Sequence, residues 1–241
     1  MQKRILQFVL IPVIWALLLV ASPVIAESGS FIVSQHGKEV GTASFKVTTT
    51  PHGRQASSLV RVNMKGLDYS LSKTESLSLG RQLRHVQLSA TVNGSAVTVT
   101  AAPGAAQMLV NISANGHSTT TPLAAHSFAV FIPDFDPGAL ETLLGLAATH
   151  NNRDLWAIVP KQAGTVQAIQ LATYADEKGT LDGKPIAVHH MIATVGNAIT
   201  DLFSDPQNQL LQAELPQKGF ALVRNGFVLT PPANPGAPPT Q

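Results

Sequence analysis

Residues 57–64 read Ser-Ser-Leu-Val-Arg-Val-Asn-Met, and this stretch indicates the fold class. Successive side chains of an extended chain point to opposite faces, so Val60, Val62 and Met64 share one face and the residues between them share the other. Such alternation, in a run that also contains β-branched residues, is typical of a strand with one buried face. We therefore predict a half-buried strand here.

The same alternation recurs along most of the chain. It appears at 43–47, 86–90, 97–99 and 108–112, and strand-like runs return at 155–159, 166–174, 186–195, 199–204, 210–215 and 220–223. Three dipeptides suit tight hairpin turns, whose two central residues need positive φ: Asn93-Gly94, Asn115-Gly116 and Asp182-Gly183. Strands joined by such turns are antiparallel, so the sequence predicts a meander.

One segment departs from this pattern. Asp136 is placed to cap a helix, and Pro137 suits the first helical position. The apolar residues that follow, Leu143 and Leu144 among them, recur at i, i+3, i+4 and i+7, which predicts one apolar helical face. We expect a helix over 137–148 whose apolar face packs on the sheet.

The predicted fold is therefore mainly β, with one large curved antiparallel meander sheet and a helical insert. We expect a half-barrel or open barrel of roughly 10–11 strands. Residues 27–229 are predicted to form a single domain, since a chain of this length suffices for one core. The proline-rich residues 230–241 cannot form a strand ladder, and we expect them to be disordered or polyproline-like.

Residues 1–26 have the pattern of a secretory signal peptide. Lys3 and Arg4 precede an apolar run, and small residues end it at Ala26, just before a polar segment. The run is short for a bilayer core of about 30 Å and contains proline. We predict cleavage after Ala26, export to the periplasm or the medium, and no stable membrane anchor after processing; an uncleaved anchor is the alternative.

The charge and the cysteine content of the chain exclude several classes of function. The chain has 16 Lys and Arg against 14 Asp and Glu, and Lys3 and Arg4 of the predicted leader account for this excess. The remaining chain is formally neutral and has no basic cluster, so nucleic acid is not an expected partner. The absence of cysteine excludes disulfides, thiol catalysis and a lipid-modified N-terminal cysteine.

Three segments resemble uncharacterised periplasmic families of unknown function. Residues 35–47, with Val-Gly-Thr-Ala in their middle, look like the first hairpin of those families; 136–144 resemble their "DPxxLxxLL" helix, and 201–216 resemble their last hairpin. These families are similar in kind to the lipoprotein-carrier half-barrels, whose curved antiparallel sheet holds an acyl chain in its concavity. The resemblance implies this architecture over about residues 30–228 and assigns no catalytic residue.

Catalytic and metal-binding signatures are absent from the sequence. It has neither a Gly-x-Ser-x-Gly elbow nor a His-Glu-x-x-His motif. His189 and His190 are neighbours in a predicted strand, so they point to opposite faces and cannot hold one ion together. Asp134 and Asp136 form an acidic pair, for which helix capping by Asp136 is favoured over acid–base catalysis. We expect a non-enzymatic protein with no catalytic residue, metal or cofactor; a hydrolase is the least favoured alternative.

Aromatic side chains gather around the predicted helix. A sheet of this size tends to curl and can enclose a ligand cavity. We expect an apolar small molecule or lipid in the concave face, and the candidate ligand-binding residues are Phe128, Phe131, Phe135, Leu143, Leu144 and Trp156. A filled core without a cavity is one alternative. Another is a structural or assembly component that contacts a second protein of the cell envelope.

Overall fold

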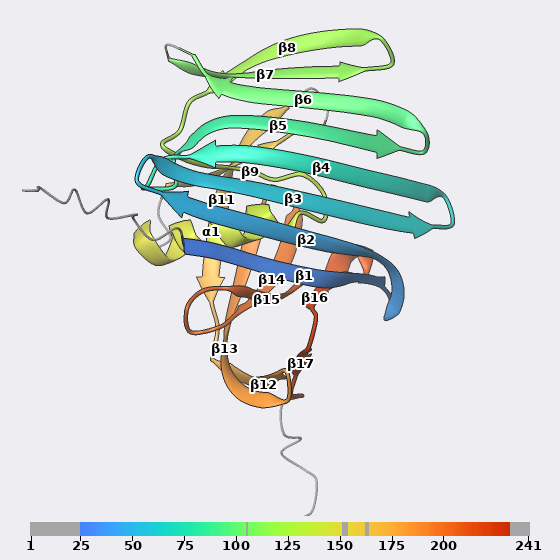
Figure 1. Cartoon of the computed structure of the whole chain (residues 1–241), viewed down its shortest axis with the longest axis vertical. Coiled ribbons are helices and arrows are strands. Elements are labelled where there is room, and N and C mark those ends of the chain that lie inside the picture. Colours follow the sequence, from blue (N-terminus) through green and yellow to red (C-terminus); the bar gives the residue numbers. More distant parts are fainter. Residues whose placement is uncertain (1–24, 105, 151–153, 162–163, 232–241) are drawn as a thin grey trace, which may run out of the picture.

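The computed structural model describes residues 25–104, 106–150, 154–161 and 164–231 (Figure 1). Its elements in chain order are β1 (Ile25–Gln35), β2 (Lys38–Thr50), β3 (Gly53–Met64), β4 (Leu67–Leu77), β5 (Leu83–Val92), β6 (Ser95–Pro103), β7 (Gln107–Ala114), β8 (His117–Ala124), β9 (Phe128–Phe131), α1 (Pro137–His150), β10 (Leu155–Val159), β11 (Thr165–Thr173), β12 (Glu177–Leu181), β13 (Lys184–Val195), β14 (Ala198–Ser204), β15 (Leu210–Leu215), the 3₁₀ turn η1 (Pro216–Lys218), β16 (Phe220–Arg224) and β17 (Phe227–Leu229).

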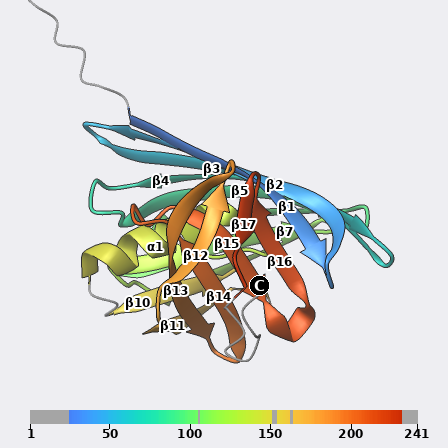
Figure 2. The same cartoon turned by 90° about the horizontal axis from the view of Figure 1, so that it is seen from below.

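The strands of the described residues form one large sheet that is not closed. β1 stands in its middle, because it pairs with β2 on one side and with β16 on the other. From β2 to β8 each strand pairs antiparallel with the next. On the other side β16 is followed by β15, β14, β13, β11, β10 and β9. The two halves lie as two layers with α1 between them (Figures 1 and 2). The predicted fold class is confirmed.

Two details of the prediction need correction. Over the part of the chain that the structure describes, the sheet has 17 strands, more than the roughly 10–11 expected from long alternating runs. Several extra strands, such as the four-residue β9 and the three-residue β17, are too short to show a period. The sheet is also mixed, because β9 and β10 pair in parallel. Parallel neighbours need a crossover connection, and α1 supplies it between these two strands.

The predicted hairpin turns are confirmed. In each of the three dipeptides the first residue has φ between 49° and 51° and the glycine has φ between 75° and 82°. These turns join β5 to β6, β7 to β8 and β12 to β13. Asn and Asp tolerate the left-handed conformation because their short polar side chains bond locally, and glycine adopts it without a steric cost. The local turn chemistry thus sets the antiparallel pairing.

The helix begins at Pro137 as predicted and ends at His150, two residues later than expected. The prediction of a single apolar face is wrong, since every residue from Pro137 to Ala147 is buried. α1 contacts β2 and β3 of one layer and β9 and β15 of the other, so packing surrounds it. Leu143 and Leu144 are 1% and 2% exposed, as expected for core side chains. With 14 residues, α1 lacks the length needed to cross a membrane.

The predicted processing boundaries fall near the ends of the described residues. Residues 1–24 of the predicted leader lie outside them, while residues 25 and 26 pair with Thr48 and Thr49 of β2. At the other end Thr230 donates a backbone hydrogen bond of 2.8 Å to β12. Residues 232–241 of the predicted tail lie outside the described part.

Candidate functional site

A cavity of about 330 Å³, partly open to solvent, lies between the start of α1 and the layer formed by β10 to β16. Its wall is mainly apolar. Leu140 and Leu143 contribute from α1, Val159 from β10, Val195 from β13 and Leu222 from β16. Each strand residue points inward because side chains alternate between the two faces of the sheet. The concave face is therefore hollow at one end of the helix, although α1 fills the rest.

Two of the six predicted ligand-binding residues, Phe135 and Leu143, line this cavity. Phe135 has φ of +57°, a left-handed conformation that is strained for an aromatic residue. Its ring packs edge-on against Phe220 with centroids 4.8 Å apart, and against Tyr69 at 6.0 Å. Such a conformation persists only where the surroundings hold it, and here these rings do so. Phe135 is therefore a fixed part of the cavity wall.

The other four predicted residues lie elsewhere. Phe131 and Leu144 are 0% and 2% exposed and belong to the central core. Phe128 and Trp156 stack on histidine rings, with centroids 3.8 Å and 3.7 Å apart. None of the four lines the cavity. Most residues of the cavity wall could not be predicted from the sequence, because the strand residues that form it alternate in the same way as ordinary core residues.

Charged side chains stand at the rim of the cavity. Lys161 Nζ lies 2.7 Å from Asp134 Oδ2, and these side chains are 52% and 34% exposed. Lys218 of η1 also borders the cavity and is exposed to solvent. An exposed ion pair such as Lys161–Asp134 contributes little to stability. Its position matters more, because a ligand that enters the cavity meets these charges.

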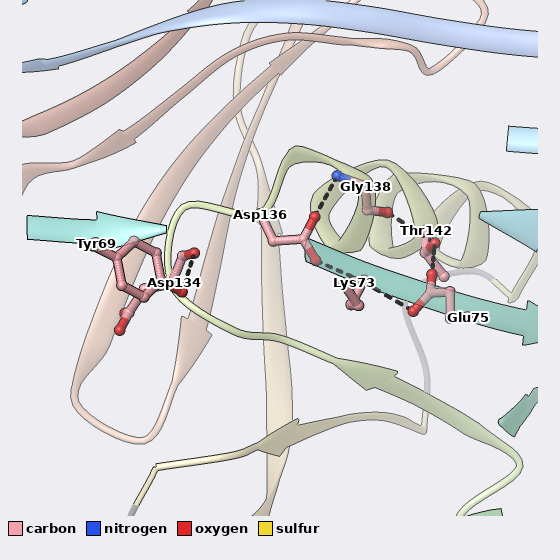
Figure 3. Close-up of polar contacts among 7 residues, drawn as sticks. All are labelled: Tyr69, Lys73, Glu75, Asp134, Asp136, Gly138 and Thr142. Atoms are coloured by element: carbon pink, nitrogen blue, oxygen red, sulfur yellow. Dashed lines mark hydrogen bonds and ion pairs between the residues drawn. The ribbon is translucent and has the colours of Figure 1, made fainter. Parts of the chain in front are cut away.

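A buried ionic network lies beside the cavity, beneath the first turn of α1 (Figure 3). Lys73 Nζ of β4 lies 2.6 Å from Asp136 Oδ2 and 3.0 Å from Glu75 Oε2, and none of the three side chains is more than 1% exposed. Thr142 Oγ1 donates to Glu75 Oε1 at 3.1 Å. Asp136 Oδ1 accepts a 2.9 Å hydrogen bond from the Gly138 amide, which confirms the predicted cap. The network therefore fixes the start of α1 on β4.

Burial governs the protonation of this network. Burial by itself lowers the pKa of the Lys73 ammonium, but the carboxylates of Asp136 and Glu75 outweigh it and hold this pKa above its ordinary value. Burial also raises the pKa of Glu75, against the opposing effect of Lys73. Burial raises the pKa of Tyr69 as well, and the negative charges of Asp134 and Asp136 add to this. Lys73, Glu75 and Asp136 are buried and paired with one another beneath the helix, so we assign the network to positioning α1.

A second acid ties the helix to the other layer. Glu141 of α1 is 4% exposed, and its Oε2 accepts a 2.8 Å hydrogen bond from the Leu210 amide of β15. Burial raises the pKa of Glu141 to about 7, and the negative charge of Glu27 adds to the rise. The hydrogen bond from Leu210 and the cations Arg224 and Arg81 act in the opposite direction. Burial thus brings the pKa of this helix acid close to neutral pH.

The two adjacent histidines face different partners. His189 Nδ1 lies 2.8 Å from Asp176 Oδ1, whereas the His190 ring lies between Glu177 and Asp201, each 3.2 Å from a ring nitrogen. They do not converge on a common point, as the strand geometry predicts. Within the described ranges, no group of three or more His, Asp or Glu side chains is arranged to hold a metal ion.

Comparison of the chain with protein-family models, with curated proteins and with solved structures finds no match. The resemblance to periplasmic half-barrel families thus stays a prediction. The cavity and the charges at its rim are the features that point to a function.

Proposed function

We propose that the protein is a non-enzymatic, exported component of the cell envelope that binds an apolar or acyl-chain ligand in the cavity beside α1. The observation that carries the proposal is the hollow, largely apolar end of the concave face. Burial of apolar ligand surface is favourable by about 0.8 kcal/mol per methylene. The predicted leader supports the export part of the proposal.

The volume of the cavity limits the size of the ligand that it can hold. Ligand pockets commonly have volumes of roughly 300–1,000 Å³, so about 330 Å³ is at the small end of that range. An apolar cavity of about 150 Å³ holds benzene, which has six carbon atoms. By proportion, the cavity here accommodates on the order of twelve non-hydrogen atoms. A medium-length alkyl chain, or the end of a longer one, therefore fits.

Direct titration with a neutral alkyl ligand tests this function. 1-Decanol has a ten-carbon chain and no charge, and isothermal titration calorimetry gives its affinity and stoichiometry. Ala198 is exposed at the cavity mouth on β14, so Ala198→Trp should obstruct entry without disturbing the core. Ala172 on β11 is also exposed but does not border the cavity, and Ala172→Trp is the matched control.

We expect one molecule of 1-decanol per chain, at least tenfold weaker binding by Ala198→Trp, and parent-like binding by Ala172→Trp. Thermal melts of both variants check that they remain folded. A parent protein that does not bind 1-decanol would overturn the proposal. Equal affinity in the parent and in Ala198→Trp would show that binding occurs elsewhere.

A further inference from the structure

The charges that a ligand can reach at the cavity rim do not cancel. Four charged residues border the cavity: Asp134, Asp136, Lys161 and Lys218. The Asp136 carboxylate has no exposed surface and is neutralised from behind by Lys73 at 2.6 Å. Asp134 and Lys161 neutralise each other as an ion pair at 2.7 Å. One positive charge, that of Lys218, is left over for a ligand.

Hydrogen bonds of the residues before and after Lys218 fix its backbone to two neighbouring turns. It ends the 3₁₀ turn η1, and Gly219 follows with φ of +66°. The carbonyl of Gly219 accepts a 2.7 Å hydrogen bond from the His36 amide in the β1–β2 turn. Beside it, Gln217 Nε2 donates at 2.8 Å to the carbonyl of Asn197 in the β13–β14 turn. Lys218 is therefore fixed at the mouth through its backbone, and only its side chain has to become ordered when a ligand binds.

An apolar wall with a positive group at its mouth suits one kind of molecule. A neutral alkyl chain can pack against the apolar wall formed by Leu140, Leu143 and Val195, but it offers no negative group to Lys218. An alkyl chain that ends in a carboxylate can pack against the wall and also bind the lysine, because an ammonium and a carboxylate form a charge-assisted hydrogen bond. Lys161 borders the same cavity but is already paired with Asp134, so Lys218 is the cation that remains for the carboxylate.

We propose, on the basis of the function proposed above, that the ligand is an alkyl carboxylate whose single negative charge lies at Lys218 while its chain lies along the apolar wall. Decanoate has twelve non-hydrogen atoms, which matches the content expected for a cavity of about 330 Å³. The excess of one reachable positive charge favours a monoanion over a dianion, since a second negative charge would meet Asp134.

The test compares three ligands of equal chain length by isothermal titration calorimetry at low salt. Decanoate should bind about tenfold more tightly than 1-decanol, the gain expected for a hydrogen bond to a charged group. Decylammonium should bind more weakly than 1-decanol, because its charge repels Lys218. Added salt should reduce the advantage of decanoate, since the rim charges are exposed to solvent.

Substitutions test whether the tighter binding of decanoate depends on the lysine at the cavity rim. Lys218→Met should lower the affinity for decanoate about tenfold and leave that for 1-decanol unchanged. Lys38→Met is the matched control, because Lys38 is exposed at the start of β2 and does not border the cavity. If 1-decanol binds and decanoate binds no more tightly, or if Lys218→Met leaves decanoate binding intact, the carboxylate inference is overturned and the apolar site stands. If neither ligand binds, both the inference and the proposed function fail.

Discussion

Replacement of Glu141 by glutamine should remove a pH dependence from the stability of the fold. Glu141 is 4% exposed and its pKa is raised by burial to about 7, against an ordinary value of 4.5. The folded state therefore holds this proton more tightly than the unfolded chain does. Its stabilising contribution is full below about pH 4.5 and is lost as the pH rises to about 7.

The size of the effect follows from the two pKa values. Each pH unit that separates them corresponds to 1.36 kcal/mol, so the loss between pH 4 and pH 8 is about 3 kcal/mol. Glutamine keeps an oxygen that can accept the hydrogen bond from the Leu210 amide but does not titrate. The free energy of unfolding of Glu141→Gln should therefore rise relative to that of the parent by about 3 kcal/mol over this range.

Urea denaturation followed by circular dichroism at a series of pH values measures this difference. The comparison with the parent cancels the titration of all other groups that the substitution leaves unchanged. Glu39→Gln is the control, because Glu39 is exposed near the start of β2 and its replacement should change the free energy of unfolding little. A parallel profile for Glu141→Gln, or one with the opposite slope, would refute the reasoning.

The remaining predictions concern the core and the N-terminus. Leu144→Ala should cost about 2–5 kcal/mol, since its side chain is buried in the core, and a thermal melt that overlays that of the parent would contradict this. Leu143→Ala should cost a similar amount and also alter the affinity for 1-decanol, measured by calorimetry, because Leu143 borders the cavity; unchanged affinity would argue against the site. Lys73→Met should lower the free energy of unfolding in urea by about 3–5 kcal/mol, because it leaves the Asp136 carboxylate buried without its cation, and parent-like stability would refute this role. N-terminal sequencing of protein recovered from its host should begin at Glu27, and a start at the initiator methionine would show the predicted cleavage to be wrong.

The elements that depend only on neighbouring residues can be predicted from the sequence. The run Leu210–Leu215 is a strand with the predicted bounds, and the turn at Asn93-Gly94 has the predicted positive φ. Asp136 caps a helix that begins at Pro137, as the local pattern indicates. Alternation, turn chemistry and capping act over a few residues, so the order of residues along the chain is enough to reveal them.

The side chains that meet across the fold cannot be predicted from these local patterns. In the sequence Lys73 lies in a polar run between Leu71 and Leu77. In the structure it is fully buried on the inner face of β4, where Asp136 from a distant segment compensates its charge. The parallel pairing of β9 with β10, the burial of α1 on all sides and the cavity beside Phe135 likewise depend on how the two layers close around the helix. These features arise from contacts between residues far apart in the chain. The hydrophobic period of one strand or helix does not indicate which other element it packs against.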